Sequence, residues 1–276
     1  MIAFDFEYYR PESIQETIEI FQKLDQKKKK VCFFSGGTEF ITFARVHQVH
    51  ADAVIDLKGI PECTALEGKE NDLIFGASVH LNQLIEANLF PLLSQNLRNI
   101  ADHTSRNKIT LGGNLNSRLM YREGMLPLLV ADAKVTMYGI EGHETHPITQ
   151  VFGKQSSLKH GQFLTQISID GSFAKMPYLA IKRTRISKIG YPIVSIAALV
   201  KDEKLRIAFS GICEYPFRSR KIEDILNDKG LPVHERIDKA VSCIPGPMID
   251  DRHASGQYRK FVLQNVLEEA MEFLEG

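Results

Sequence analysis

The sequence has few cysteines, no excess of charge of one sign and no long apolar run. Its four cysteines lie far apart in the 276 residues, at Cys32, Cys63, Cys213 and Cys243. None has a partner at the spacing of two to four residues that iron–sulfur and structural zinc sites use, so we expect reduced and buried thiols. The 34 basic and 34 acidic residues give a formal net charge of zero, which gives no support to a nucleic-acid partner.

Membrane insertion and secretion are also unsupported. The longest nearly apolar stretch, around residues 191–200, is shorter than the roughly 20 residues that a transmembrane helix needs. The first residues, Met1–Asp5, show no charged leader followed by an apolar core, which is the mark of a secretory signal. We therefore expect a cytoplasmic protein without membrane contact. Its length allows two domains or one large one.

Hydrophobic periodicity divides the chain into three units of predicted structure. The first unit is a small parallel sheet with helices, whose elements span 14–24 (a helix with Ser13 as N-cap), 31–34, 38–46 and 53–57. The second unit has strands over 73–77, 134–138 and 164–169, and helices over 81–93 (broken at Pro91), 95–103 and 127–131. The third unit has strands over 178–182, 193–199 and 205–210, and helices over 218–226, 233–241 and 258–274.

Two glycine pairs, about seventy-five residues apart, are the most informative motifs. Gly36-Gly37 follow a predicted buried strand and open a helix, where free backbone N–H groups can bind phosphate. Gly112-Gly113 lie among Thr110, Asn114 and Asn116, whose side chains can bond phosphate, ribityl or ring atoms. The first loop lacks the third glycine of the dinucleotide fingerprint and the lysine of a P-loop, and each loop alone also fits a plain turn. Together they predict a ligand with a central diphosphate, most simply a dinucleotide.

Other polar patterns predict no further chemistry. His143 and His146 have a spacing that could clamp a metal, but they follow the turn-like stretch Gly139–Gly142 and do not form the His-Glu-x-x-His signature. We expect a surface loop there and no metal ligand. No Gly-x-Ser-x-Gly elbow is present in the sequence, so a serine hydrolase is unsupported. No catalytic residue is predicted.

Taken together with their flanks, the two loops resemble the FAD-binding medium subunits of molybdenum hydroxylases, the xanthine dehydrogenase and carbon monoxide dehydrogenase type enzymes. That family has a Gly-Gly-Thr-Asp-Leu-like loop and then a Thr-Ile-Gly-Gly-Asn-like loop. This chain has Gly-Gly-Thr-Glu-Phe and Thr-Leu-Gly-Gly-Asn at about the same spacing. The opening 6–13, the run 98–107, Leu126-Pro127 and the tail 251–259 are also similar, so the resemblance covers nearly the whole chain.

The resemblance implies an α+β fold in two parts. Residues 1–170 would form an FAD-binding domain, with a small parallel β-α-β subdomain over about 1–58 and a larger mixed or antiparallel sheet subdomain over about 59–170. Residues 171–276 would form a C-terminal flavoprotein domain made of an antiparallel sheet with helices.

The resemblance also implies which residues hold the FAD. Backbone N–H groups of the first loop would bind the diphosphate, at Ser35, Gly36, Gly37, Thr38, Glu39 and Phe40. The other side of the cofactor would be lined by Thr110, Gly112, Gly113, Asn114 and Asn116, with Ile167 near the flavin or adenine. Glu39 stands where Asp is commoner. Many family members have an Asp immediately before the Leu-Pro pair. In this chain Met125 occupies that position, and Glu123 would take the role of the Asp. The family also has one basic residue near the flavin. The candidates for it in this chain are Lys182, Arg183 and Arg185.

By the same resemblance, the chain would be the FAD subunit of a xanthine dehydrogenase-type molybdenum hydroxylase. Electrons would pass from a molybdopterin-binding large subunit, through the 2Fe-2S clusters of a small subunit, to FAD and then to NAD⁺ or another acceptor. The preference for the xanthine type rests on the segment Leu119–Gly124. Two alternatives stay open: a degenerate FAD fold that acts as an assembly or interaction module, and a stand-alone flavin reductase. The altered Asp and Lys positions motivate the first alternative.

Overall fold

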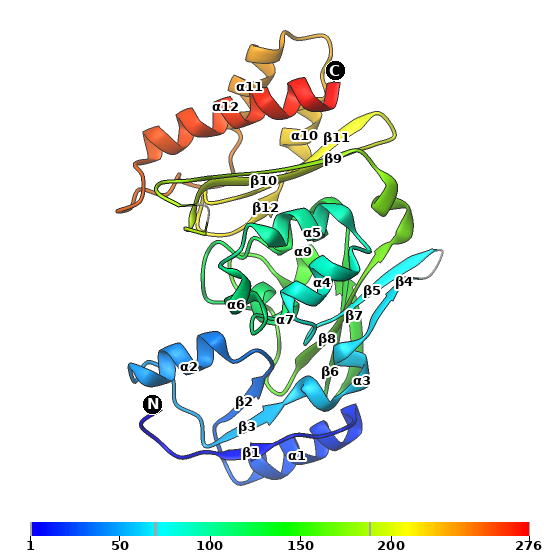
Figure 1. Cartoon of the computed structure of the whole chain (residues 1–276), viewed down its shortest axis with the longest axis vertical. Coiled ribbons are helices and arrows are strands. Elements are labelled where there is room, and N and C mark those ends of the chain that lie inside the picture. Colours follow the sequence, from blue (N-terminus) through cyan, green and yellow to red (C-terminus); the bar gives the residue numbers. More distant parts are fainter. Residues whose placement is uncertain (1, 69–70, 188, 276) are drawn as a thin grey trace.

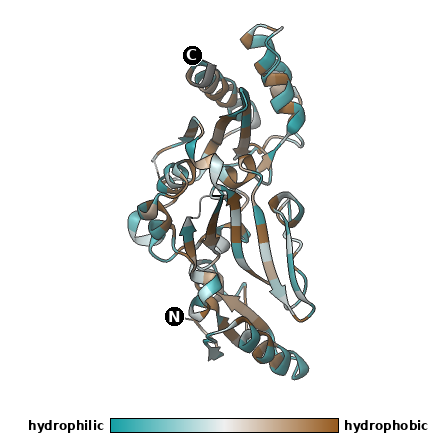
Figure 2. Ribbon diagram, turned by 90° about the vertical axis from the view of Figure 1, so that its right-hand side faces the viewer, coloured by the Kyte–Doolittle hydropathy of each residue, from teal (hydrophilic) through white to brown (hydrophobic). Residues whose placement is uncertain are grey.

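Three sheets, stacked along the long axis of the molecule, organise the fold (Figure 1). The computed structural model describes residues 2–68, 71–187 and 189–275. The N-terminal sheet lies at the bottom of the view, the middle sheet with its helices at the centre, and the C-terminal sheet with its covering helices at the top. Figure 2 shows that hydrophobic residues concentrate in the strands, while the outer helices carry hydrophilic faces. The α+β fold expected from the sequence is confirmed.

The N-terminal sheet is parallel and has the strand order β1-β3-β2. Its elements are β1 (Glu7–Tyr9), α1 (Ile14–Gln26), β2 (Val31–Phe34), α2 (Thr38–Arg45) and β3 (Ala53–Asp56). Ser13 caps α1 as expected, because its hydroxyl accepts the N–H of Glu16 at 3.1 Å. Phe34 and Asp56 end the paired strands β2 and β3 in register. Residues that follow these two strands therefore meet at one edge of the sheet.

The middle sheet is antiparallel, with the order β4-β5-β8-β6-β7. Its strands are β4 (Leu66–Gly68), β5 (Asp72–Gly76), β6 (Lys134–Gly139), β7 (Gly142–Pro147) and β8 (Phe163–Asp170). The associated helices are α3 (Pro61–Thr64), α4 (Leu81–Ala87), α5 (Pro91–Arg98), α6 (His103–Arg106), α7 (Leu111–Leu115), α8 (Met125–Val130) and α9 (Ile148–Val151). Helix α8 is buried along its whole length, so it forms the centre of the main core.

The C-terminal sheet has the order β12-β11-β10-β9 and is antiparallel. It comprises β9 (Tyr178–Thr184), β10 (Pro192–Lys201), β11 (Lys204–Ser210) and β12 (Phe217–Arg218), followed by α10 (Arg220–Leu226), α11 (Val233–Ser242) and α12 (Gly256–Glu275). Alternate residues of β10 serve two cores. Ala197 and Leu199 join the core of the middle unit, whereas Ile196 and Ala198 join the core under the C-terminal helices. The sheet is thus buried on both faces.

The sequence misplaced three local elements. Pro91 does not break one helix but begins α5 as its first residue, where the backbone N–H that proline lacks would have no intrahelical partner in any case. The separate helix expected over 95–103 is wrong, since α5 runs to Arg98 and a short helix begins only at His103 after the Asp102 cap. The surface loop expected around His143 is the edge strand β7. Its residues pair with β6 along the whole strand, and the ring of His143 stacks on Tyr138.

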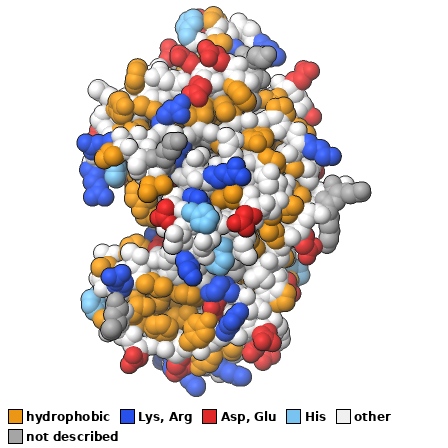
Figure 3. Space-filling view, in the orientation of Figure 1, with side chains coloured by type: hydrophobic (Ala, Val, Ile, Leu, Met, Phe, Trp, Pro, Cys, Tyr) orange, Lys and Arg blue, Asp and Glu red, His pale blue; other side chains and the backbone are white. Residues whose placement is uncertain are grey.

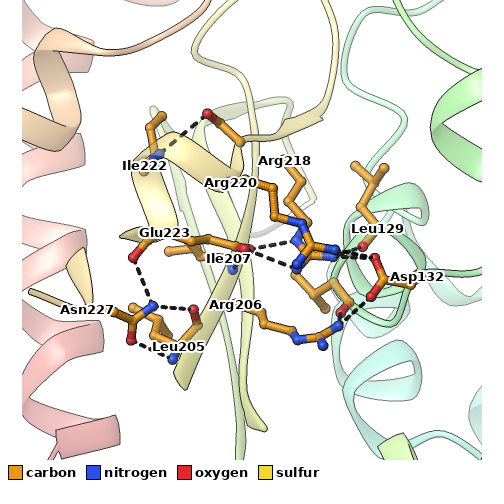
Figure 4. A network of polar contacts seen from close by, with 12 residues as sticks. Leu129, Asp132, Leu205, Arg206, Ile207, Arg218, Arg220, Ile222, Glu223 and Asn227 are labelled. Atoms are coloured by element: carbon orange, nitrogen blue, oxygen red, sulfur yellow. Dashed lines mark hydrogen bonds and ion pairs between the residues drawn. The ribbon is translucent and has the colours of Figure 1, made fainter. Parts of the chain in front are cut away.

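One carboxylate joins the middle unit to the C-terminal sheet. Asp132, just after α8, contacts Arg206 at 2.5 Å, Arg218 at 2.7 Å and Arg220 at 3.4 Å (Figure 4). Arg218 also pairs with the buried Glu223 through two hydrogen bonds, at 2.6 and 3.0 Å. We call these five residues the Asp132 cluster. Arg218 is nearly inaccessible, with 5% of its side chain exposed; Glu223 holds it within the C-terminal unit, and Asp132 links it to the middle unit.

The helices give no sign of a membrane span. Within the ranges that the structure describes, no helix combines the length and the apolar character that crossing a membrane requires.

Candidate functional site

The first glycine loop joins β2 to α2 at the carboxyl edge of the parallel sheet. Gly37 has a φ of +72°, a left-handed conformation that turns the chain into α2 and that only glycine adopts without strain. A Cβ at Gly37 would also come within 2.1 Å of the Phe34 ring. The backbone N–H groups of Thr38 and Glu39 have no partner among the described residues. They point from the N-terminus of α2, so an anion can bind there.

Lys58 brings a positive charge to the same loop. It follows β3, and its ammonium group donates to the Ser35 carbonyl oxygen at 2.7 Å and contacts both carboxylate oxygens of Asp56. Burial pushes the pKa of Asp56 upward, but the hydrogen bonds from Lys58 and Tyr8 outweigh this effect and hold the pKa below its usual range. Asp56 therefore stays ionised and keeps Lys58 in position beside the loop.

The two glycine loops meet in space. A Cβ on Gly36 would lie 2.0 Å from the carbonyl oxygen of Lys108 and 3.3 Å from the nitrogen of Thr110. Only a residue without a side chain permits this approach of two backbones. The hydroxyl of Ser35 lies 2.9 Å from that of Ser78, which follows β5, so the first loop contacts the middle unit at two points.

Glu39 forms a third contact between the N-terminal unit and the middle unit. One of its carboxylate oxygens accepts the N–H of Arg118 at 3.0 Å, and the other accepts the hydroxyl of Ser117. Both partners follow the second loop. The first turn of α2 is thereby tied to the segment beyond Asn116, and Glu39 acts as a bridge whose side chain is already engaged.

The second glycine loop is a tightly bonded turn at the start of α7. The Thr110 hydroxyl accepts the N–H of Gly113 at 3.2 Å and caps the helix. The N–H groups of Leu111 and Gly112 donate to the carbonyl oxygens of Val79 and Ala77. A Cβ on Gly112 would lie 2.7 Å from that of Ala77, so Gly112 serves packing. Gly113 is exposed, which leaves it free to face a ligand.

Two pockets flank the contact between the loops. One, of about 210 Å³, is lined by Lys58, Ser78, Val79 and His80 among others. The second, of about 430 Å³, begins at Asn116 and extends along the segment to Arg122. Figure 3 shows the surface hollowed on the left between the N-terminal and middle units, where Figure 1 places α2 below α6. The contact between the two loops therefore lies at a hollowed part of the surface.

Comparison with known proteins decides the family. Residues 4–169 match the family described as "FAD binding domain in molybdopterin dehydrogenase". The chain belongs to this family.

Relatives match over almost the whole chain. The glyceraldehyde dehydrogenase medium chain of Sulfolobus acidocaldarius is 22% identical and aligns over 94% of this chain and 95% of its own length. The nicotine 6-hydroxylase medium subunit of Paenarthrobacter nicotinovorans is 26% identical over 94% of each chain. A carbon monoxide dehydrogenase structure from Hydrogenophaga pseudoflava superposes with a TM-score of 0.88 at 20% identity, over 99% of this chain and 98% of that one. This structural similarity shows that the two chains share a fold.

Family membership confirms FAD as the cofactor and identifies the chain as the FAD-binding part of a molybdenum hydroxylase-type oxidoreductase. The first loop fits the diphosphate of FAD well. It presents a glycine turn, unpaired N–H groups at a helix N-terminus and the nearby ammonium of Lys58. Bound FAD would supply the redox chemistry, and the residues of this chain bind and orient it.

Not all of the expected site residues face the cleft. Thr110 is 1% exposed and caps α7, and the Asn114 side chain accepts the N–H of Gly124 at 2.9 Å. The ring of Phe40 packs edge-on against Phe34 and Phe6. The side chain of Ile167 is fully buried in the main core, in register between Phe75 and Val135, so it does not reach the surface.

Glu123 and Lys182 pair with each other where α8 meets the C-terminal sheet. The Lys182 ammonium lies 2.9 Å from a Glu123 carboxylate oxygen and 2.8 Å from the carbonyl oxygen of Asn99. Both side chains are less than a tenth exposed. Burial raises the pKa of Glu123 above its usual range, against the opposing charge of Lys182. Arg183 and Arg185 bind elsewhere, to Glu269 and to the Arg252 carbonyl.

Sequence reasoning missed four residues at the cleft, namely Lys58, Ser78, His80 and Arg122. A signal existed for Lys58, because residues after adjacent parallel strands share an edge. His80 pairs with Thr110 in an isolated β-bridge, and burial lowers its pKa. Its partners come from a chain segment about thirty residues away, so no local pattern could reveal it. Ser78 and Arg122 likewise depend on tertiary contacts.

Proposed function

We propose that this chain is the FAD-carrying subunit of a multi-subunit molybdenum hydroxylase, which receives electrons from iron–sulfur clusters of a small partner subunit. A large molybdopterin-binding subunit would supply those electrons, and FAD would pass them to NAD⁺ or another acceptor. The observation that carries the proposal is the contact of Gly36 with Lys108, which joins the two loops into one cleft. Relatives named as medium chains or medium subunits support the multi-subunit arrangement.

We assign the diphosphate to the first loop, from Ser35 to Phe40, with Lys58 as the added cation. Unpaired N–H groups there can donate to an oxyanion, whereas those of Leu111 and Gly112 are already bonded. Gly113 and Asn116 are exposed on the opposite wall, and we assign them to the ribityl or ring portion. Thr110, Gly112 and Asn114 do not contact the cofactor in this assignment; their contacts hold the second loop in place.

The proposed domain division follows the three units. The FAD-binding domain would span residues 1–170, with subdomains of about 1–58 and 59–170, and the C-terminal domain would span 171–276. Separate hydrophobic cores for the N-terminal and C-terminal units support this division. The family match over residues 4–169 is consistent with it.

The substrate belongs to another subunit of the complex. A xanthine dehydrogenase-type assembly remains our proposal on the basis of the segment Leu119–Gly124. The relatives described above are named for glyceraldehyde, nicotine and carbon monoxide.

Purification of the chain alone tests the function. We expect a yellow protein that releases non-covalent FAD on heating and shows no NADH-dependent dye reduction unless partner subunits are added. A colourless protein that takes up no added FAD would support an assembly module instead. Dye reduction by the isolated chain would support a stand-alone flavin reductase. Co-purification with a molybdopterin subunit and an iron–sulfur subunit from the native source would establish the complex, and a xanthine turnover assay of that complex would test the substrate.

A further inference from the structure

The larger cleft pocket contains a buried arginine without a counter-ion. Arg122 is 5% exposed, and its Nη2 donates to the Gly153 carbonyl oxygen. Its Nε is buried and has no partner, and no carboxylate among the described residues forms an ion pair with this guanidinium. Two other buried arginines, Arg218 and Arg259, each pair with a carboxylate. An unpaired buried cation is costly, so Arg122 lacks the partner that its environment demands.

The surroundings of Arg122 form a built pocket. The cavity has a volume of about 430 Å³, and its charged lining residues are Arg118, Arg122, Lys154 and Glu214. Lys154 and Glu214 pair at 2.5 Å and are both more than half exposed, so this ion pair lies at the mouth and can open. Three cations against one carboxylate leave an excess of positive charge. The amide of Gln155 and the hydroxyl of Ser156 add donors.

The backbone at Arg122 is also unusual. Its φ of +29° is a conformation that residues with a side chain rarely adopt. Strained backbone that persists in a folded protein often marks a functional position. Burial lowers the pKa of Arg122 below the value of a free guanidinium, which agrees with the absence of a compensating anion.

We propose that this pocket binds the phosphate or carboxylate group of a small molecule other than FAD, with Arg122 and Lys154 as the anion-binding residues. Arg122 offers planar N–H donors that suit either oxyanion, and the cavity volume falls in the range of roughly 300–1,000 Å³ typical of ligand sites. The site opens beside Asn116, on the wall of the FAD cleft. A ligand bound here would lie next to the cofactor. The proposal goes beyond the proposed function, because it requires a second ligand.

Anion titrations of the full-length chain saturated with FAD test this site. Calorimetry with inorganic pyrophosphate and, separately, with succinate shows whether phosphate or carboxylate is preferred. We expect R122Q to weaken the binding of the preferred probe by about tenfold or more. R220Q serves as the matched control, since Arg220 is 70% exposed and belongs to the Asp132 cluster; its affinity should equal that of the wild type. Flavin absorbance, recorded on each sample, reports separately on FAD binding.

Two surface variants keep the test decisive if R122Q does not fold. K154Q should weaken probe binding several-fold. E214Q should strengthen it, because the carboxylate that competes for Lys154 is gone. The proposal is overturned if neither probe binds the wild type, if R122Q and K154Q bind like the wild type, or if the probe binds only the FAD-free chain and saturating FAD abolishes its binding. The last result would assign the pocket to FAD itself.

Discussion

Gly36 and Lys108 touch through their backbones, at a distance that leaves no room for a Cβ. This single contact joins the parallel sheet of the N-terminal unit to the loop that leads into α7. It brings the N-terminal end of α2 next to the segment that carries the second glycine pair, which lies more than seventy residues away in the sequence. The cleft exists because these two backbones can approach so closely.

Gly36→Ala should therefore be enough to disrupt FAD binding. The new methyl group would lie 2.0 Å from a backbone oxygen, so the two units must separate. We expect FAD affinity to fall by about tenfold or more and stability to fall by about 1–3 kcal/mol. Fluorescence titration with FAD and urea unfolding measure the two effects.

Gly153→Ala is the matched control for this substitution, because nothing lies within 4 Å of a Cβ at that position. It should change neither quantity appreciably. If Gly36→Ala retained wild-type FAD affinity, the loop contact would not define the site. Gly113→Ala should have a milder effect than Gly36→Ala, since its Cβ would meet only the Thr110 hydroxyl, at 2.9 Å.

Lys182 has a structural role in this chain. Lys182→Met would leave Glu123 buried without a positively charged partner, and we expect a loss of about 3–5 kcal/mol in the free energy of unfolding. Arg183→Gln, which breaks only the exposed pair with Glu269, should stay within about 0.5 kcal/mol of the wild type. Chemical denaturation of both variants distinguishes the roles. A Lys182→Met protein of normal stability but weak flavin binding would show instead that Lys182 serves the cofactor.

Asp132 should couple the middle unit to the C-terminal sheet. Asp132→Asn keeps the size of the side chain and tolerates the φ of +50° at this position, so it tests the charge alone. We expect a loss of about 1–2 kcal/mol, because Arg218 is almost inaccessible and loses one of its two anions. Arg220→Gln removes the longest and most exposed contact and should cost much less. Equal effects of the two substitutions would refute this account.

His80 should make stability depend on pH in the weakly acidic range. Burial lowers the pKa of His80 in the folded protein, whereas the unfolded chain has the ordinary value of about 6.5. Below that pH the unfolded state binds more protons than the folded state, so stability is lost as the pH falls from about 6.5 toward the lower folded pKa. The melting temperature should drop between pH 7.5 and 5.5, and less so in His80→Gln. An unchanged slope in the variant would exclude His80 as the cause.

The thiols of Cys32 and Cys63 should be unreactive in the native protein. Burial raises the pKa of Cys32 to about 11 and that of Cys63 to about 12. At pH 8 only about one thiol in a thousand or fewer is then a thiolate, the reactive form. Iodoacetamide labelling followed by mass spectrometry should leave both unmodified until urea is added. Rapid native labelling of Cys32, which lies three residues before Ser35, would instead suggest a reactive thiol beside the flavin loop.

Local sequence determined much of the framework. The strand at 31–34, the Ser13 cap and the alternating strands of the C-terminal sheet follow from short-range periodicity and capping, and each was found where expected. The short helices of the middle unit were harder to locate. Their ends depend on packing against the sheet, as the run from Pro91 to Arg98 shows.

The sequence by itself determined the glycine turns, because a φ of +72° at Gly37 favours glycine and the backbone approach at Gly36 leaves no room for a Cβ. It did not determine which polar groups stay free. Tertiary contacts decided that the N–H groups of the second loop bond to Ala77 and Val79, that Glu123 is paired with Lys182, and that Arg122 is left without a carboxylate. The availability of a polar group for a ligand depends on every neighbour that folding brings to it, and most of those neighbours are distant in the chain.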